Sequence, residues 1–306
     1  MKAFTIQVMK NIALPFLGST ILALLASCSI SGQIDFSKKA DSSVEPSSSE
    51  STGNGDGKAS SVISIDPKSI TDAKVLFVGN SFTFYNAIDD ITESLGKSLG
   101  MDIECDRVAK SSQKLIDTSK SSDDLGAQFD AALEKPYTHI VLQEHSTQPL
   151  NDYASFLAGV KALKGKIDAK LPNAKVYLYS TWGFANLASS RNCTIPEAEL
   201  SLRQAYEKCG EEAGIPVSYV GKAFSYSYVN CPDINLYFTD DKHPSYAGSY
   251  LAASTHLATL FGVDVRESTF IGDPEKSMES GGVQYVEESK ASKLRQIAYQ
   301  IANNLI

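Results

Sequence analysis

Two short segments, far apart in the chain, carry residue types that together could cleave an ester bond. Ser81 follows the apolar run 75–79 and Asn80, so a hydroxyl stands where a strand should end. His243 follows Asp240 by three residues, in the sequence Asp-Asp-Lys-His-Pro. A serine hydroxyl is a weak nucleophile at neutral pH and needs a neighbouring base, which a carboxylate in turn orients. This pattern predicts Ser81 as nucleophile, His243 as base and Asp240 as its orienting acid. On its own, Ser81 would be typical of a helix N-cap.

The other histidines are weaker candidates for the base. Pro244 forces an extended conformation on His243, which favours projection of its imidazole from a loop. His145 is the main rival, because it follows a predicted strand. His139 begins that strand, at the opposite end. His256 lies in an apolar helical stretch and is expected to be structural.

A hydrolase also needs hydrogen-bond donors for the oxyanion that forms during attack. The backbone N–H of Ser81, at a helix start, is one candidate, and the side-chain amide of Gln143 is another. A third donor is expected from the backbone of Ser111 or Ser112. Glu144, next to Gln143, is expected near the substrate. Alternatively, Gln143 is a polar residue at a strand end that ties down a neighbouring loop.

These residues must be positioned by elements that the hydrophobic pattern predicts. Short apolar or β-branched runs, typical of strands covered on both faces, alternate with helical stretches. The expected strands are 74–79, 102–108, 139–143, 175–180 and 217–220. The expected helices are 87–99, 124–133, 153–170, 195–213, 246–261 and 290–305. This alternation predicts an α/β fold with a central parallel sheet of about five strands.

In such a sheet, ligands bind where the strands end at their carboxyl side. Ser81 follows the first expected strand, and 143–145 follows the third. Residues 180–182 follow the fourth, and the loop 240–243 precedes a late helix. All of these segments are therefore expected at one edge of the sheet.

The segments Gly79-Asn-Ser-Phe and Asp240-x-x-His243 resemble those of the SGNH (GDSL-type) hydrolases. The resemblance spans about residues 73–261, and the order Ser, Asp, His agrees with that family. It implies a flavodoxin-like three-layer α/β/α fold and an ester-cleaving enzyme without a cofactor or metal. It also implies that Ser81, Asp240 and His243 are the catalytic residues.

The chain departs from the family pattern at three places. Asn80 replaces the usual Asp, and the second-block glycine has no clear match, leaving Ser111 or Ser112 in its place. The third block reads Gln143-Glu144-His instead of Gly-x-Asn. The run Leu142-Gln-Glu is similar to the Gln-Gly-Glu of sialic-acid and carbohydrate O-acetylesterases of the same superfamily. That likeness implies a short acyl group, such as acetyl, on a carbohydrate.

The N-terminal segment resembles an export signal of a bacterial lipoprotein. Residues 1–27 hold Lys2 and Lys10 and an apolar stretch too short to span a bilayer. The run Leu25-Ala-Ser precedes Cys28, which is expected to be lipidated and to anchor the protein at the extracytoplasmic face of the cell membrane. Residues 28–64 are rich in Ser and charged residues and are expected to form a disordered tether. Residues 65–306 are expected to form one domain.

The net charge bears on possible partners, and the cysteines bear on disulfides and metal binding. The formal net charge is −8, and loss of residues 1–27 with their two lysines makes it about −10. An acidic surface argues against nucleic acid as a partner. The chain has five cysteines, one of which is Cys28. Among the other four, a disulfide between Cys193 and Cys231 or between Cys193 and Cys209 is possible, and the sequence does not decide between them. Cys105 is expected to be buried in a core strand. No spacing resembles a zinc site.

Two other functions are considered. The motifs that should supply the oxyanion donors depart from the family pattern. This departure favours, as an alternative, a non-catalytic surface lipoprotein that binds glycan on the same fold. A metal-dependent phosphoesterase would use Asp240, His243, Glu144 and His145, but further Asp or His ligands are lacking. Aromatic residues between 219 and 250, together with Trp182, could line a pocket but are expected mainly to pack in the core.

Overall fold

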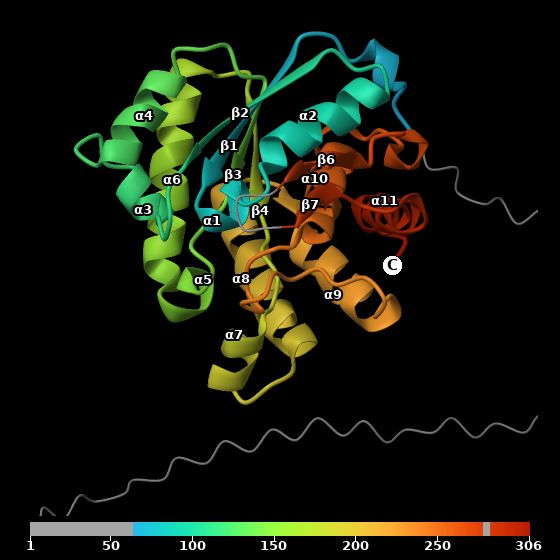
Figure 1. Ribbon diagram of the computed structural model, residues 1–306. Helices are drawn as coiled ribbons and strands as arrows, with labels where there is room; N and C mark the ends of the chain where they lie inside the picture. The colour runs from blue at the N-terminus through green and yellow to red at the C-terminus, as the bar shows by residue number, and fades with distance from the viewer. Residues whose placement is uncertain (1–63, 278–281) are drawn as a thin grey trace, which may run out of the picture. The chain divides into compact units, whose positions relative to one another are not determined.

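A parallel sheet of five strands, in the order β2-β1-β3-β4-β5, lies at the centre of the structure (Figure 1). The computed structural model describes residues 64–277 and 282–306. The strands are β1 (Ala73–Gly79), β2 (Ile103–Ala109), β3 (His139–Leu142), β4 (Lys175–Tyr179) and β5 (Val217–Ser218). The five expected strands are confirmed, with ends that differ by one or two residues. The strand order is that of a flavodoxin-like fold.

Side chains along each strand alternate between two hydrophobic clusters. In β1, Val75 and Phe77 belong to one cluster, and Leu76 and Val78 belong to the other. All four are fully buried. Successive side chains of a strand point to opposite faces, so a strand covered on both faces is apolar throughout.

Helices cover both faces of the sheet, as Figure 1 shows. One layer holds α2 (Ile88–Ser98), α9 (Val220–Asn230), α10 (Tyr246–Phe261) and α11 (Glu288–Ala302). The other holds α3 (Leu115–Thr118), α4 (Asp124–Ala132) and α6 (Tyr153–Lys170). Helix α8 (Ile195–Ala213) contributes to both clusters, with Leu202 in the first and Tyr206 in the second. The three-layer α/β/α architecture expected from the sequence is confirmed.

The remaining elements are short. They are α1 (Ser81–Phe84), α5 (Gln148–Asn151), α7 (Ala185–Ser190), the 3₁₀ turns η1 (Pro67–Ser69) and η2 (Val265–Glu267), and the antiparallel ribbon of β6 (Gly272–Ser277) and β7 (Val283–Tyr285).

Among the elements that the sequence did not predict are helix α9 and the β6–β7 ribbon. Helix α9 starts where the last strand was expected to continue, because β5 is only two residues long. The N–H of Gly221 donates to the carbonyl of Ser180 at 2.8 Å, which fixes this early helix start against the end of β4. The sequence did not predict the β6–β7 ribbon, because β6 is polar and mostly exposed and shows no alternation of apolar residues.

The cysteines of the described part are free thiols: Cys105, Cys193, Cys209 and Cys231. Neither disulfide that the sequence left open is formed in the structure. Cys105 is partly buried rather than fully buried, because β2 lies at the edge of the sheet.

The predicted signal peptide 1–27, the lipidation site Cys28 and the predicted tether, apart from residue 64, lie outside the described residues. Within the described ranges, none of the helices combines the length and apolar character needed to cross a bilayer.

Candidate active site

Ser81 lies at the carboxyl end of β1, as the first residue of α1. The preceding Asn80 caps this helix, because its Oδ1 accepts a hydrogen bond from the N–H of Phe82 at 3.2 Å. Residue 81 therefore follows the N-cap instead of forming it. Its own N–H has no acceptor among residues 64–277 and 282–306. The hydroxyl and a free backbone donor are thus presented by the same residue.

The structure brings Ser81, His243 and Asp240 into one hydrogen-bonded chain. Nε2 of His243 lies 2.9 Å from Oγ of Ser81, and Nδ1 lies 2.5 Å from Oδ2 of Asp240. The other carboxylate oxygen of Asp240 accepts the backbone N–H groups of Lys242 at 3.1 Å and His243 at 2.9 Å. One carboxylate therefore shapes the loop and orients the imidazole.

Asp240 is suited to remain ionised beside the imidazole. Partial burial alone would raise the pKa of its carboxyl group. Hydrogen bonds from the ring and backbone of His243 and the backbone of Lys242 outweigh burial and lower the pKa below its usual value. An ionised carboxylate at this position accepts the Nδ1–H and favours the tautomer whose Nε2 can take a proton from Ser81.

Two aromatic rings hold the imidazole of His243. The ring of Tyr85 stacks on it nearly in parallel, with ring centroids 4.3 Å apart and an interplanar angle of 10°. Phe82 meets it edge-on at 5.6 Å. Both rings come from the same turn that carries Ser81. Sequence analysis did not assign these two residues to the site; Tyr85 lies four positions after Ser81, a spacing that offered the signal.

Trp182 links this region to the core. It is fully buried between Phe82 and Phe224, with ring centroids 4.4 Å and 4.2 Å away. Its Nε1–H donates to the carbonyl of Lys242 at 3.0 Å, next to His243. For Trp182 and Phe224, packing in the core is confirmed.

A tight turn after β2 adds further backbone donors. The N–H of Gln113 donates to the carbonyl of Lys110 at 3.2 Å, so Ser111 and Ser112 occupy the middle of this turn. Ser112 has a left-handed φ of 58°. Neither serine N–H has an acceptor in the part of the chain that the structure describes. Ser111, rather than Ser112, lines the cleft beside Ser81.

An open cleft of about 760 Å³ gives access to Ser81 and His243. Residues from the β1–α2 segment, from β2 and its following turn, and from β7 line the rest of it. They include Tyr85, Asn86, Arg107, Ser111 and Gln284. Ser81 and His243 thus face a space large enough for a small substrate, lined by both aromatic and polar groups.

Solved structures of other proteins resemble this fold. The chain is similar to a protein from Slackia heliotrinireducens described as a candidate SGNH hydrolase. The two are 25% identical, with a TM-score of 0.52, over 61% of this chain and 98% of that one. It is also similar in fold to a DUF4886 family protein from Bacteroides uniformis, at 18% identity and a TM-score of 0.62, over 74% of this chain and 93% of that one. No family model and no curated protein matches the chain.

The chain belongs to the SGNH hydrolase superfamily. At this level it is a hydrolase, as expected from its sequence. Ser81, His243 and Asp240, which the sequence resemblance implied as catalytic residues, lie within hydrogen-bond distance along one chain of contacts.

Gln143 does not take the oxyanion position in this SGNH hydrolase. Its side chain is fully buried, and its Oε1 accepts from the backbone N–H of Asn80 and from Oγ1 of Thr83, both at 2.9 Å. Its Nε2 donates to the carbonyl of Glu144. The expected oxyanion role is therefore wrong, and the alternative that Gln143 ties down a neighbouring loop is confirmed. The physical reason is that the Asn80 N–H, turned inward at the strand end, needs a buried acceptor.

Glu144 is also inside the protein rather than in contact with the cleft. It is fully buried, and its Oε1 accepts from the backbone N–H groups of Leu115 at 3.2 Å and His145 at 2.6 Å. Burial raises the pKa of its carboxyl group to about 7, although these two hydrogen bonds act in the opposite direction. The expected substrate-binding role is wrong; Glu144 joins the segment after β2 to the segment after β3.

The remaining histidines do not meet Ser81. His145 is half-buried, and burial, with Lys242 and Lys114 nearby, lowers the pKa of its ring. His256 is buried in α10 and shares a hydrogen bond of 2.9 Å with Oγ of Ser218, in the structural role expected.

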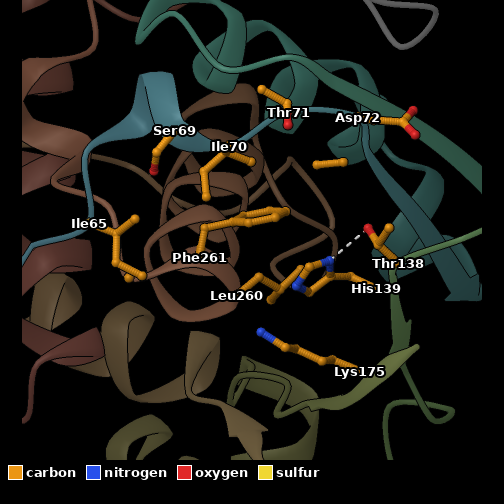
Figure 2. Close-up of a pocket in the computed structure, with 12 residues that line it drawn as sticks. Ile65, Ser69, Ile70, Thr71, Asp72, Thr138, His139, Lys175, Leu260 and Phe261 are labelled. Carbon is orange, nitrogen blue, oxygen red and sulfur yellow. Dashed lines mark hydrogen bonds between the residues drawn. The ribbon is translucent and has the colours of Figure 1, made fainter. Parts of the chain in front are cut away.

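A second hollow, of about 430 Å³, lies at the amino ends of the strands, away from Ser81. Figure 2 shows the residues that line it. His139 forms part of its wall beside Thr138 and Phe261, with Nδ1 2.9 Å from the hydroxyl of Thr138. Burial and the nearby Lys175 lower the pKa of His139 to about 4. No serine hydroxyl is bonded to this ring within the described residues, so this hollow lacks the arrangement found at Ser81.

We expect Gln143→Ala to lower the free energy of unfolding by about 1–3 kcal/mol, because it leaves the buried N–H of Asn80 and the hydroxyl of Thr83 without an acceptor. Urea denaturation measures this loss. Gln148→Ala is the control, since buried Gln148 makes only a long 3.4 Å bond to Asp152 and should cost less. Normal stability with kcat reduced about 10²–10³-fold would instead restore an oxyanion role.

We expect Glu144→Gln to flatten the dependence of stability on pH. Since the folded pKa of Glu144 is about 7 and its ordinary value is 4.5, the folded state holds this proton more tightly. The wild type should therefore lose stability as pH rises from about 4.5 to about 7, by up to about 3 kcal/mol. Glutamine keeps the acceptor oxygen and cannot titrate. Equal losses in both proteins between pH 5 and pH 8, measured by urea denaturation, would contradict this prediction.

Proposed function

We propose that this protein is an exported serine esterase, tethered to the membrane at Cys28, that removes O-acetyl or other short acyl groups from carbohydrate. The observation that carries the catalytic part is the unbroken hydrogen-bonded chain from Ser81 through His243 to Asp240, open to the cleft. The carbohydrate part rests on the likeness of residues 142–144 to the third block of sugar O-acetylesterases and on the polar groups that line the cleft.

In the proposed reaction, Oγ of Ser81 attacks the ester carbonyl while Nε2 of His243 takes its proton. The imidazolium that forms is stabilised by the Asp240 carboxylate and held in place by Tyr85. His243 then gives the proton to the leaving sugar hydroxyl, and the acyl group remains on Ser81. Water, deprotonated by His243, releases the acid by the same path. The reaction needs no cofactor.

The oxyanion in this proposal is bound by backbone N–H groups. Ser81 supplies one, and the turn at Ser111 and Ser112 supplies another. Since Gln143 is occupied inside the protein, these backbone donors replace the side-chain amide expected from the sequence. Donors fixed by a helix start and a tight turn need little rearrangement when the negative charge develops.

Hydrolysis of a short acyl ester, such as 4-nitrophenyl acetate, tests the catalytic assignment. Ser81→Ala and His243→Ala should each lose activity by several orders of magnitude, as when members of other catalytic triads are removed. His145→Ala is the matched control and should keep most of the activity. If His145→Ala abolished turnover and His243→Ala did not, the base would be misassigned. Loss of activity with a chelator would favour the metal-dependent alternative.

Membrane attachment is tested with Cys28. The run Leu25-Ala-Ser before Cys28 supports lipidation there, so Cys28→Ala should move the protein from the membrane to the soluble fraction after cell lysis. Cys193→Ala removes another thiol and should leave the distribution unchanged. Retention of the Cys28→Ala variant in the membrane fraction would refute the proposed anchor.

A further inference from the structure

Among residues 64–277 and 282–306, the cleft wall contains one permanently charged cation, Arg107 of β2. In the sheet register Arg107 pairs with Phe77, and Ala109 pairs with Gly79, two residues before Ser81. Arg107 and Ala109 both line the cleft. Alternate residues of a strand share a face, so the guanidinium rises on the same side of the sheet as α2, along the cleft that Ser81 opens into.

Asp89 binds one side of the Arg107 guanidinium and leaves the rest of the group accessible. Nη1 of Arg107 donates to Oδ1 of Asp89 at 2.6 Å, and the carboxylate side chain is only 8% exposed. The Arg107 side chain keeps 38% of its surface exposed. Its Nε and Nη2 groups have no acceptor in residues 64–277 and 282–306. The guanidinium is therefore held from one side, and N–H groups remain for a ligand.

The other cleft residues do not neutralise this charge. In the described part of the chain, neither Asp nor Glu lines the cleft; Asn86, Ser111 and Gln284 supply neutral polar groups. Nδ2 of Asn86 is bonded to the carbonyl of Pro244 and the hydroxyl of Ser249. This positive group stands out in a chain whose formal net charge is −8. An anionic ligand would meet no carboxylate of these walls.

We propose that Arg107 binds a carboxylate of the substrate, so that the ester removed at Ser81 is carried by an acidic sugar such as a uronic acid. This inference rests on the proposed function. A guanidinium presents parallel N–H groups that match a carboxylate, and such charge-assisted pairs are stronger than neutral hydrogen bonds. The neutral polar groups of the cleft suit the hydroxyls of the same sugar. Arg107 is thus a specificity-determining residue.

Matched substrates test this inference: an acetylated methyl glucuronoside and the corresponding acetylated methyl glucoside, which differ in the carboxylate. The wild type should favour the acidic sugar, and its KM for that sugar should rise with salt concentration. Arg107→Gln should lower kcat/KM for the acidic sugar about tenfold or more, and for the neutral sugar less than about threefold. Arg107→Lys keeps the charge and should retain part of the preference.

Lys110→Gln is the control, because it removes an exposed positive charge three residues away that does not line the cleft. It should leave the preference unchanged. Equal loss on both sugars in Arg107→Gln would show that the Arg107–Asp89 pair only supports the fold. A wild type that hydrolyses 4-nitrophenyl acetate through Ser81 but shows no preference would overturn this inference and leave the esterase intact. Hydrolysis of none of the three esters would refute the proposed function, and this inference with it.

Discussion

The hydrogen bond between the backbone N–H of Asn80 and the side chain of Gln143 is the contact on which the site depends. It joins the ends of β1 and β3 at the point where the chain turns into α1. Gly79 is required beside it, because a Cβ there would lie 2.5 Å from Oε1 of Gln143. A buried N–H without an acceptor costs about 1–3 kcal/mol. The strand pairing, the turn and the direction of the Ser81 hydroxyl are therefore set together.

The base is held in a different way from the nucleophile. Asp240 is exposed on its loop, so burial contributes little to its position. Hydrogen bonds hold the loop instead: the N–H of Phe238 donates to the carbonyl of His243 at 2.7 Å, and Trp182 binds the carbonyl of Lys242. Since Tyr85 and Phe82 pack on the imidazole, the turn that carries Ser81 also places its base. Nucleophile and base are aligned by one aromatic cluster.

The sequence predicted the sheet, three helices with the observed bounds and the meeting of Ser81, Asp240 and His243. These features follow from apolar runs and from the rule that sites lie at the carboxyl ends of parallel strands. The sequence did not predict correctly which way the side chains at the strand ends point. A polar residue after a buried strand can face outward or inward, and for Gln143 and Glu144 the neighbouring backbone N–H groups decided in favour of inward. Helix α9 was missed because its first residue, Val220, was assigned to the preceding strand, which is only two residues long. Tyr85 was missed because its position close to Ser81 in the sequence does not show that its ring stacks on His243.

The separation of Ser81 from His243 along the chain has a consequence for biosynthesis. The ribosome makes Ser81 early and His243 late, and α10 follows His243 in the chain. Domains fold during synthesis as their segments emerge. A chain that ends before residue 243 therefore holds Ser81 without the imidazole that bonds to it. Under the proposed function, esterase activity would therefore appear only after synthesis has passed residue 243.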